Sequence, residues 1–138
     1  MVIKLNEAYW SIDKLPGISQ KDQNLLTSNG IHNTKDLLTQ VRTTQDRYTL
    51  ASKLQIHLKY INKWSALADL ARVPSVGWEH CGALLHCGIG SVAQLKQTSF
   101  SKLYSHIKRL YVANTRNKNL SPSVEQVKQW IEQAKLLD

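Results

Sequence analysis

One pattern of residues occurs twice in this chain, and this repeat limits the possible folds more than any other feature. Residues 15–31, LPGISQKDQNLLTSNGI, have a counterpart 58 positions later in residues 73–89, VPSVGWEHCGALLHCGI. Each copy has an apolar residue and a proline, a turn of small residues, a stretch of helical pattern and then Gly-Ile. The matches continue without a gap to Leu37 and Leu95. We therefore expect two units with the same local structure.

Each unit is expected to contain a helix, a tight turn and a second, shorter helix. Gly30 and Gly88 stand where a residue with a left-handed backbone commonly follows a helix end. Asn33 and Ser91 come next, and both residue types are frequent N-caps. An acid or amide follows each of them three positions later, which completes a capping-box pattern.

A second similarity extends the repeat toward the end of the chain. Residues 63–70, KWSALADL, resemble residues 129–136, QWIEQAKL, at an offset of 66. The eight extra residues fall in the segment NTRNKNLSPS, where we expect a basic, polar loop over Asn114 to Asn119. Ser121 before Pro122 is expected to start the last helix, because proline is well tolerated at the first helical position.

The remaining stretches also have the spacing of amphipathic helices, and no alternating run predicts a strand. The expected apolar stripes are Leu58, Ile61, Ser65 and Ala68 in one stretch, and Leu103, Ile107 and Leu110 in another. The sequence therefore predicts an all-α fold of about eight short helices. Since half of a 138-residue chain buries little surface alone, residues 13–71 and 72–138 should share one core as a single domain, residues 1–138.

Composition narrows the class of protein. A hydrophobic fraction of 42% is ordinary for a globular chain, and no apolar run is long enough for a membrane span. The first residues, MVIKLNEAYWSIDK, lack the pattern of a signal peptide, so we expect a cytoplasmic protein. Two cysteines provide no disulfide framework. Trp10, Trp64 and Trp130 are expected in the core, and Trp78 on the surface.

Positive charge is concentrated in the second half. The net charge is +8, and no acidic residue occurs between Glu79 and Glu125. The bases in that stretch are Lys96, Lys102, Lys108, Arg109, Arg116 and Lys118, together with His80, His86 and His106. A surface that binds a polyanion should therefore lie mainly in the second half.

Basic and aromatic residues share one expected helix, Ser101 to Ala113. One strip holds Lys102, His106 and Arg109, and its neighbour holds Tyr104, Lys108 and Tyr111. Arg116 and Lys118 would extend this patch into the following loop. Such a mixture suits a phosphate backbone with occasional stacking. The alternative is a solvated charged face whose tyrosine rings lie half-buried over the core.

Catalysis and metal binding have little support. His80, Cys81, His86 and Cys87 lie within one expected helix, but no two of them have the three- or four-residue spacing that places ligands on one face. Cys81 is expected to pack in the core as a small apolar residue. No catalytic or nucleotide-binding motif is present. We expect a protein that is not an enzyme and has no metal or other cofactor.

The proline-glycine turn between two short helices resembles the helix-hairpin-helix motif. The whole pattern, with a Trp-x-x-x-Ala-x-Leu helix closing each unit, is similar to an uncharacterised tandem helix-hairpin-helix family, a domain of unknown function widespread in photosynthetic bacteria. The resemblance covers roughly residues 13–136. It rests on Leu15-Pro16-Gly17-Ile18, Gly30-Ile31, Asp36-Leu37-Leu38, Trp64, Asp69-Leu70, Gly77, Gly88-Ile89, Leu95, Glu125-Gln126-Val127 and Trp130.

Helix-hairpin-helix proteins in general bind a phosphate through the N–H groups of a Gly-apolar-Gly turn, so the resemblance implies a phosphate site in each turn. Both copies depart from this pattern. The first, Gly17-Ile18-Ser19, lacks the second glycine and has Asp22 close by, whereas the second, Ser75-Val76-Gly77, lacks the first. Either turn can instead serve only to reverse the chain.

Two functions remain open. One is a binding protein that contacts the DNA or RNA backbone without sequence specificity, through Ser75, Val76, Gly77 and Trp78 and through Lys102, His106, Lys108, Arg109, Arg116 and Lys118. The other is an adaptor that docks an acidic protein partner on the same surface. Net charge favours the first and the incomplete glycine turns favour the second.

Overall fold

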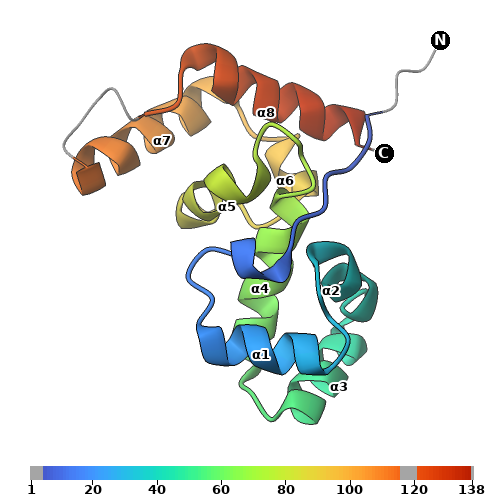
Figure 1. Ribbon diagram of the computed structural model, residues 1–138. Helices are drawn as coiled ribbons and strands as arrows, with labels where there is room; N and C mark the ends of the chain where they lie inside the picture. The colour runs from blue at the N-terminus through green and yellow to red at the C-terminus, as the bar shows by residue number, and fades with distance from the viewer. Residues whose placement is uncertain (1–4, 116–120, 138) are drawn as a thin grey trace.

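The computed structural model describes residues 5–115 and 121–137, and these residues form eight α-helices and no strand (Figure 1). The elements are a 3-10 helix η1 (Ile12–Lys14), then α1 (Gln20–Ser28), α2 (Thr34–Gln40), α3 (Thr44–Leu54), α4 (Leu58–Leu70), α5 (Gly77–His86), α6 (Val92–Leu95), α7 (Phe100–Thr115) and α8 (Val124–Leu136). The predicted all-α class is confirmed.

Equivalent Gly-Ile turns end the first helix of each unit. Gly30 and Gly88 have φ angles of 81° and 87°. Ile31 and Ile89 each donate their N–H to a leucine carbonyl five residues earlier, both at 3.0 Å. In each unit this bond runs from the residue after a left-handed glycine back to the last turn of the helix, which is a common way for a helix to end. The two turns therefore have the same structure, as the repeat predicted.

The predicted N-caps of the second helices are confirmed. Asn33 accepts a hydrogen bond from the N–H of Asp36 at 2.8 Å, and Ser91 accepts one from the N–H of Gln94 at 3.0 Å. The side chains of Asp36 and Gln94 accept in turn from the backbone of the residue that precedes each cap. The same short motif thus starts α2 and α6.

The prediction that Ser121 starts the last helix is wrong. Helix α8 begins at Val124, and Ser123 is its N-cap. Ser123 and Gln126 form a complete capping box, in which each side chain accepts a hydrogen bond from the backbone of the other, at 3.2 and 2.8 Å. The capping box satisfies two backbone donors. This favours a helix start at Val124 over one at Pro122, although proline is well tolerated at the first helical position.

Helix α7 also extends past Asn114, where the sequence predicted that a loop begins. Helix α7 continues through Thr115, because neither glycine nor proline interrupts its last turn. The rest of that loop, including Arg116 and Lys118, lies outside the described residues.

Helix α4 lies in the middle of the molecule, and both units pack against it (Figure 1). Helices α2 and α3 contact α4 from the first unit, and α5 contacts it from the second. Ile61, Ser65 and Ala68 of the predicted stripe are buried, and Leu58 is partly buried against the same core. Trp64 and Trp130 are buried, Trp10 is partly buried and Trp78 is exposed, so the tryptophan predictions agree with the structure.

The two proline turns have different conformations. Leu15 to Ile18 form a turn in which the Ile18 N–H bonds to the Leu15 carbonyl at 3.2 Å, and Gly17 has a φ of 74°. Proline followed by a positive-φ glycine is typical of a type II turn. In the second unit Ser75 replaces that glycine, and the positive φ, 54°, moves to Gly77. Each turn keeps its glycine where its own backbone requires one.

Alanine at Gly77 should destabilise the fold more than alanine at Gly30. Both backbones have positive φ, at which a side chain costs about 1 kcal/mol. A Cβ at Gly77 would also stand 3.1 Å from Cζ2 of Trp10, whereas one at Gly30 meets nothing within 4 Å. Urea unfolding should show a loss of about 1 kcal/mol for Gly30→Ala and about 2–3 kcal/mol for Gly77→Ala. Equal losses would contradict the role given to Trp10.

Candidate nucleic-acid interface

Helix α7 lies with α8 at one end of the molecule, and packs on α5 and α8 (Figure 1). Its apolar side is anchored by Leu103 and Ile107, which are buried, and by the partly buried Leu110. The predicted stripe is therefore the face that contacts the core. The basic residues lie on the rest of the helix surface.

The cations of α7 face solvent without a carboxylate partner. Lys102, Lys108 and Arg109 are exposed, and His106 is partly exposed. None of them forms an ion pair with any described residue, and α7 itself contains no acid. Lys102 and Arg109 are seven residues apart, which corresponds to about 10 Å along a helix. Lys102 and Arg109 therefore lie on one strip of α7 with His106 between them, and Lys108 lies on the neighbouring strip.

The tyrosines of α7 belong to the packing. Tyr104 stacks on Phe100, with ring centroids 5.6 Å apart and planes inclined by 17°. The Tyr111 hydroxyl lies 3.5 Å from Nδ1 of His80, and both tyrosines are partly buried against the core. This agrees with the alternative in which the rings lie half-buried. The tyrosine rings of α7 are therefore engaged in packing.

A shallow hollow of about 500 Å³ lies beside Arg109, lined by α7 and the end of α5. Cys87, His86 and His106 contribute to its lining. Burial raises the pKa of the Cys87 thiol, and the Arg109 charge opposes this effect. No three His, Cys, Asp or Glu side chains among the described residues are arranged to hold a metal ion.

In the second proline turn, Pro74 is exposed, Ser75 is half-buried and the two residues that follow face inward. Val76 and Gly77 are buried, and the N–H groups of both donate to the Val73 carbonyl at 2.9 Å. The Ser75 N–H donates to Oε1 of Gln133 at 2.9 Å, and its carbonyl accepts from the Trp130 indole at 3.1 Å. Because both residues are buried and their N–H groups bond within the turn, Val76 and Gly77 present no surface to a partner.

Trp78 is the exposed residue next to this turn. Its ring lies under the ammonium group of Lys14, 4.9 Å from the ring centroid. The contact joins the first unit to the start of α5, and Pro16 lies against Gly82 of the same helix. Trp78 therefore presents an accessible aromatic edge beside a cation from the other unit.

The first proline turn is the more accessible of the two, which the sequence did not indicate. Gly17 is exposed, and Nζ of Lys63 lies 3.9 Å from the position that a Gly17 Cβ would occupy. Ser19 caps α1 by accepting from the Asp22 N–H at 3.1 Å. Lys63 belongs to α4, far from this turn in the sequence, so only the fold brings this cation to it.

The sequence model of a family described as a domain of unknown function, DUF4332, matches residues 16–137. This chain belongs to that family. The match covers both units, as expected from the repeat. No match was found among curated proteins or among solved structures. None of the helices in the described part of the chain combines the length and hydropathy that a bilayer crossing requires.

Stability should depend on the protonation of His80. Its ring packs 5.1 Å from the Trp130 ring, and burial lowers the pKa of His80 below its ordinary value of 6.5, against the effect of Glu79. The unfolded chain therefore takes up a proton at higher pH than the folded protein. The free energy of unfolding should fall as the pH is lowered through about 6.5. His80→Gln should remove this dependence in urea titrations at several pH values, and the same change at exposed His32 is the control. An unaltered slope for His80→Gln would contradict it.

The two thiols should react at different rates. Cys81 is fully buried, and burial raises the pKa of its thiol to about 12, whereas Cys87 is partly exposed. Because the thiolate is the reactive form, iodoacetamide should modify Cys87 in the folded protein and Cys81 only after unfolding. Peptide mass spectrometry distinguishes the sites. Arg109→Gln should slow the reaction of Cys87, because the cation favours its thiolate. Faster labelling of Cys81 would contradict the packing described.

Proposed function

We propose that this protein binds the phosphate backbone of nucleic acid without sequence specificity, is not an enzyme, and works in the cytoplasm. The observation that supports this most is the group of Lys102, Lys108 and Arg109 on two neighbouring strips of α7, exposed and without an ion pair among the described residues. Unpaired surface cations attract a polyanion and release its counterions on binding. Together with a net charge of +8, this group of cations suits a polymer of evenly spaced negative charges.

The expected selectivity follows from the kind of side chain on α7. Its exposed charged groups are two lysines and one arginine, its histidine is partly exposed, and its tyrosines are engaged in packing. Lysine contacts with phosphate fix position but carry no sequence information. The protein should therefore bind unrelated sequences with similar affinity.

We also infer that both units are helix-hairpin-helix units. The support is the Pro-Gly turn before α1, the Pro-Ser turn before α5, and the matching Gly-Ile turns that follow these helices. Of the two proline turns, the first is the better candidate for a second phosphate contact, because Gly17 is exposed and Lys63 lies beside it. The second turn, sealed by Gln133 and Trp130, serves to join α5 to α8.

Reversing three charges on α7 tests the proposal. The variant Lys102→Glu, Lys108→Glu, Arg109→Glu should bind every sequence more weakly, and the salt slope should fall by about one for each phosphate that the variant no longer binds. Fluorescence anisotropy with two unrelated duplexes and one RNA strand, over a range of salt concentrations, measures both quantities. The control carries the same charge change on exposed lysines of the first unit, Lys21→Glu, Lys53→Glu and Lys59→Glu. Its affinity should decrease less.

Two outcomes would overturn this function. Equal weakening by the two triple variants would show that net charge alone is responsible. Absence of binding to any oligonucleotide at low salt, with a protein captured from extract that survives nuclease treatment, would favour an adaptor for an acidic protein partner.

A further inference from the structure

A cleft of about 480 Å³ lies where the first unit meets the turn before α6, away from α7. Its lining comes from α2, α3 and their connection, from α4, from the N-terminal segment and from Gly90 and Ser91. The volume lies within the range of small-molecule sites, about 300–1,000 Å³. Charged, hydroxyl and apolar groups all line the cleft.

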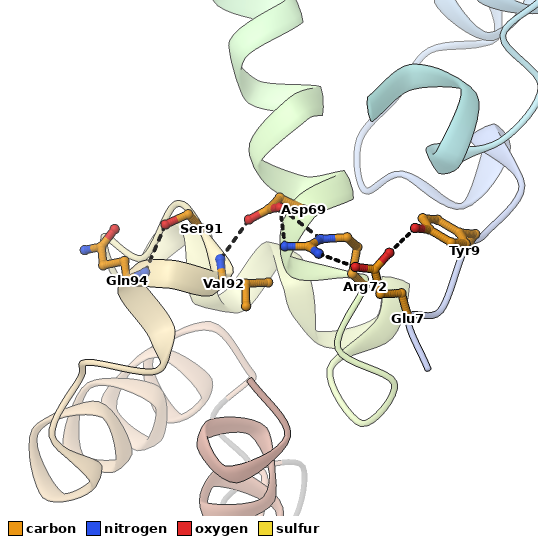
Figure 2. Close-up of polar contacts among 7 residues, drawn as sticks. All are labelled: Glu7, Tyr9, Asp69, Arg72, Ser91, Val92 and Gln94. Carbon is orange, nitrogen blue, oxygen red and sulfur yellow. Dashed lines mark hydrogen bonds and ion pairs between the residues drawn. The ribbon is translucent and has the colours of Figure 1, made fainter. Parts of the chain in front are cut away.

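The two carboxylates in the cleft already have partners. Glu7 and Asp69 bind the guanidinium of Arg72 at 2.7 and 2.8 Å, as Figure 2 shows. Asp69 also accepts the N–H of Val92 at 2.8 Å, at the start of α6. Glu7 accepts a hydrogen bond from the Tyr9 hydroxyl. Both carboxylates are therefore bound, and together with Arg72 they leave one negative charge.

Three other cations that line the cleft have no carboxylate partner. Lys35, Arg42 and Arg47 form no ion pair with any described residue. Arg47 is held by two hydrogen bonds, from Nε to the Val41 carbonyl at 3.3 Å and from a terminal nitrogen to Oδ1 of Asn62 at 3.4 Å. These bonds use two of its five N–H donors and leave the others available. The cleft therefore holds surplus positive charge, part of it fixed in position.

Apolar groups complete the cleft. Leu38 and Ala66 line it, and the Tyr9 ring lies 5.6 Å from the ammonium group of Lys35. An anion with an organic body would place its charge against the cations and its body against these groups. A phosphate offers three oxygens to three cations, and arginine is well suited to phosphate geometry.

We propose that this cleft binds a small phosphorylated molecule, with the phosphate held by Lys35, Arg42 and Arg47 and the organic part on Leu38, Ala66 and Tyr9. The site is separate from the surface proposed for nucleic acid, because no residue of α7 lines it. Variants in one site therefore leave the other intact, and each proposal can fail alone.

Isothermal titration calorimetry of the full chain at low salt tests the site with three probes: inorganic phosphate, adenosine 5′-monophosphate and adenosine. We expect the monophosphate to bind more tightly than phosphate, and adenosine to show no binding. Lys35→Gln and Arg42→Gln should each weaken monophosphate binding about tenfold, the usual effect of one charge-assisted hydrogen bond. Both side chains are exposed, and circular dichroism and the Tm confirm folding of each variant.

Matched variants separate this site from general charge effects. Lys53→Gln removes the same charge from an exposed lysine of α3 that does not line the cleft, and should leave binding unchanged. Equal weakening by Lys53→Gln, or equal binding of adenosine and its monophosphate, would overturn the proposal. So would the absence of any binding at millimolar monophosphate. Weaker oligonucleotide binding by Lys35→Gln and Arg42→Gln, without binding of the monophosphate, would assign the cleft to the nucleic-acid backbone instead and also overturn it.

Discussion

The packing of both units on helix α4 is the interaction on which the rest of the structure depends. Residues on several sides of this helix are buried, among them Ile61, Trp64, Leu67 and Leu70. A helix buried on more than one face needs neighbours on each, and α2, α3 and α5 provide them. Without α4, the apolar faces of α2 and α5 would have no common partner. This explains why the two repeated units share one core.

A polar connection at the end of α4 holds the N-terminal segment in place. The Ala8 N–H donates to the Arg72 carbonyl at 2.9 Å, and the Trp10 indole donates to the Ala71 carbonyl at 2.7 Å. Arg72 binds Glu7 and Asp69, and Asp69 in turn binds the start of α6 (Figure 2). Residues 69–72, at the end of α4, therefore join the N-terminal segment to the start of α6. The same contacts place Glu7 and Tyr9 in the cleft and keep its carboxylates occupied.

The cations of the two proposed sites lie on two different kinds of surface. On α7 the exposed cations lie along the surface of one helix, which can contact an extended polyanion at several points. In the cleft the cations line a concave site, which suits a compact anion with a body of its own. The same residue types thus support two proposals, and the difference between them comes from the surface on which the residues lie.

Local chemistry determined much of this fold. The caps at Asn33 and Ser91, the Gly-Ile turns and the apolar stripe of α4 were predictable, because each depends on residues within a few positions of one another. The start of α8 was mispredicted, because two local signals compete there and the capping box of Ser123 satisfies more backbone groups than Pro122 does. The exposed bases of α7 were also predictable, since helical periodicity separates them from the stripe of Leu103 and Ile107.

Only the tertiary structure decided which of these features a partner can reach. In the second proline turn, Gln133 and Trp130, more than fifty residues away, take up the backbone N–H and carbonyl of Ser75. The first turn gains a cation because α4 brings Lys63 to it. The cleft exists because α2 and α3 pack on α4 and so bring Lys35, Arg42 and Arg47 near Asn62. Sequence alone specified the helices and their faces, because helical hydrogen bonds and caps form between residues close in the chain. Packing between distant segments decided the sites, because neither a cavity nor the burial of a turn has a local sequence signal.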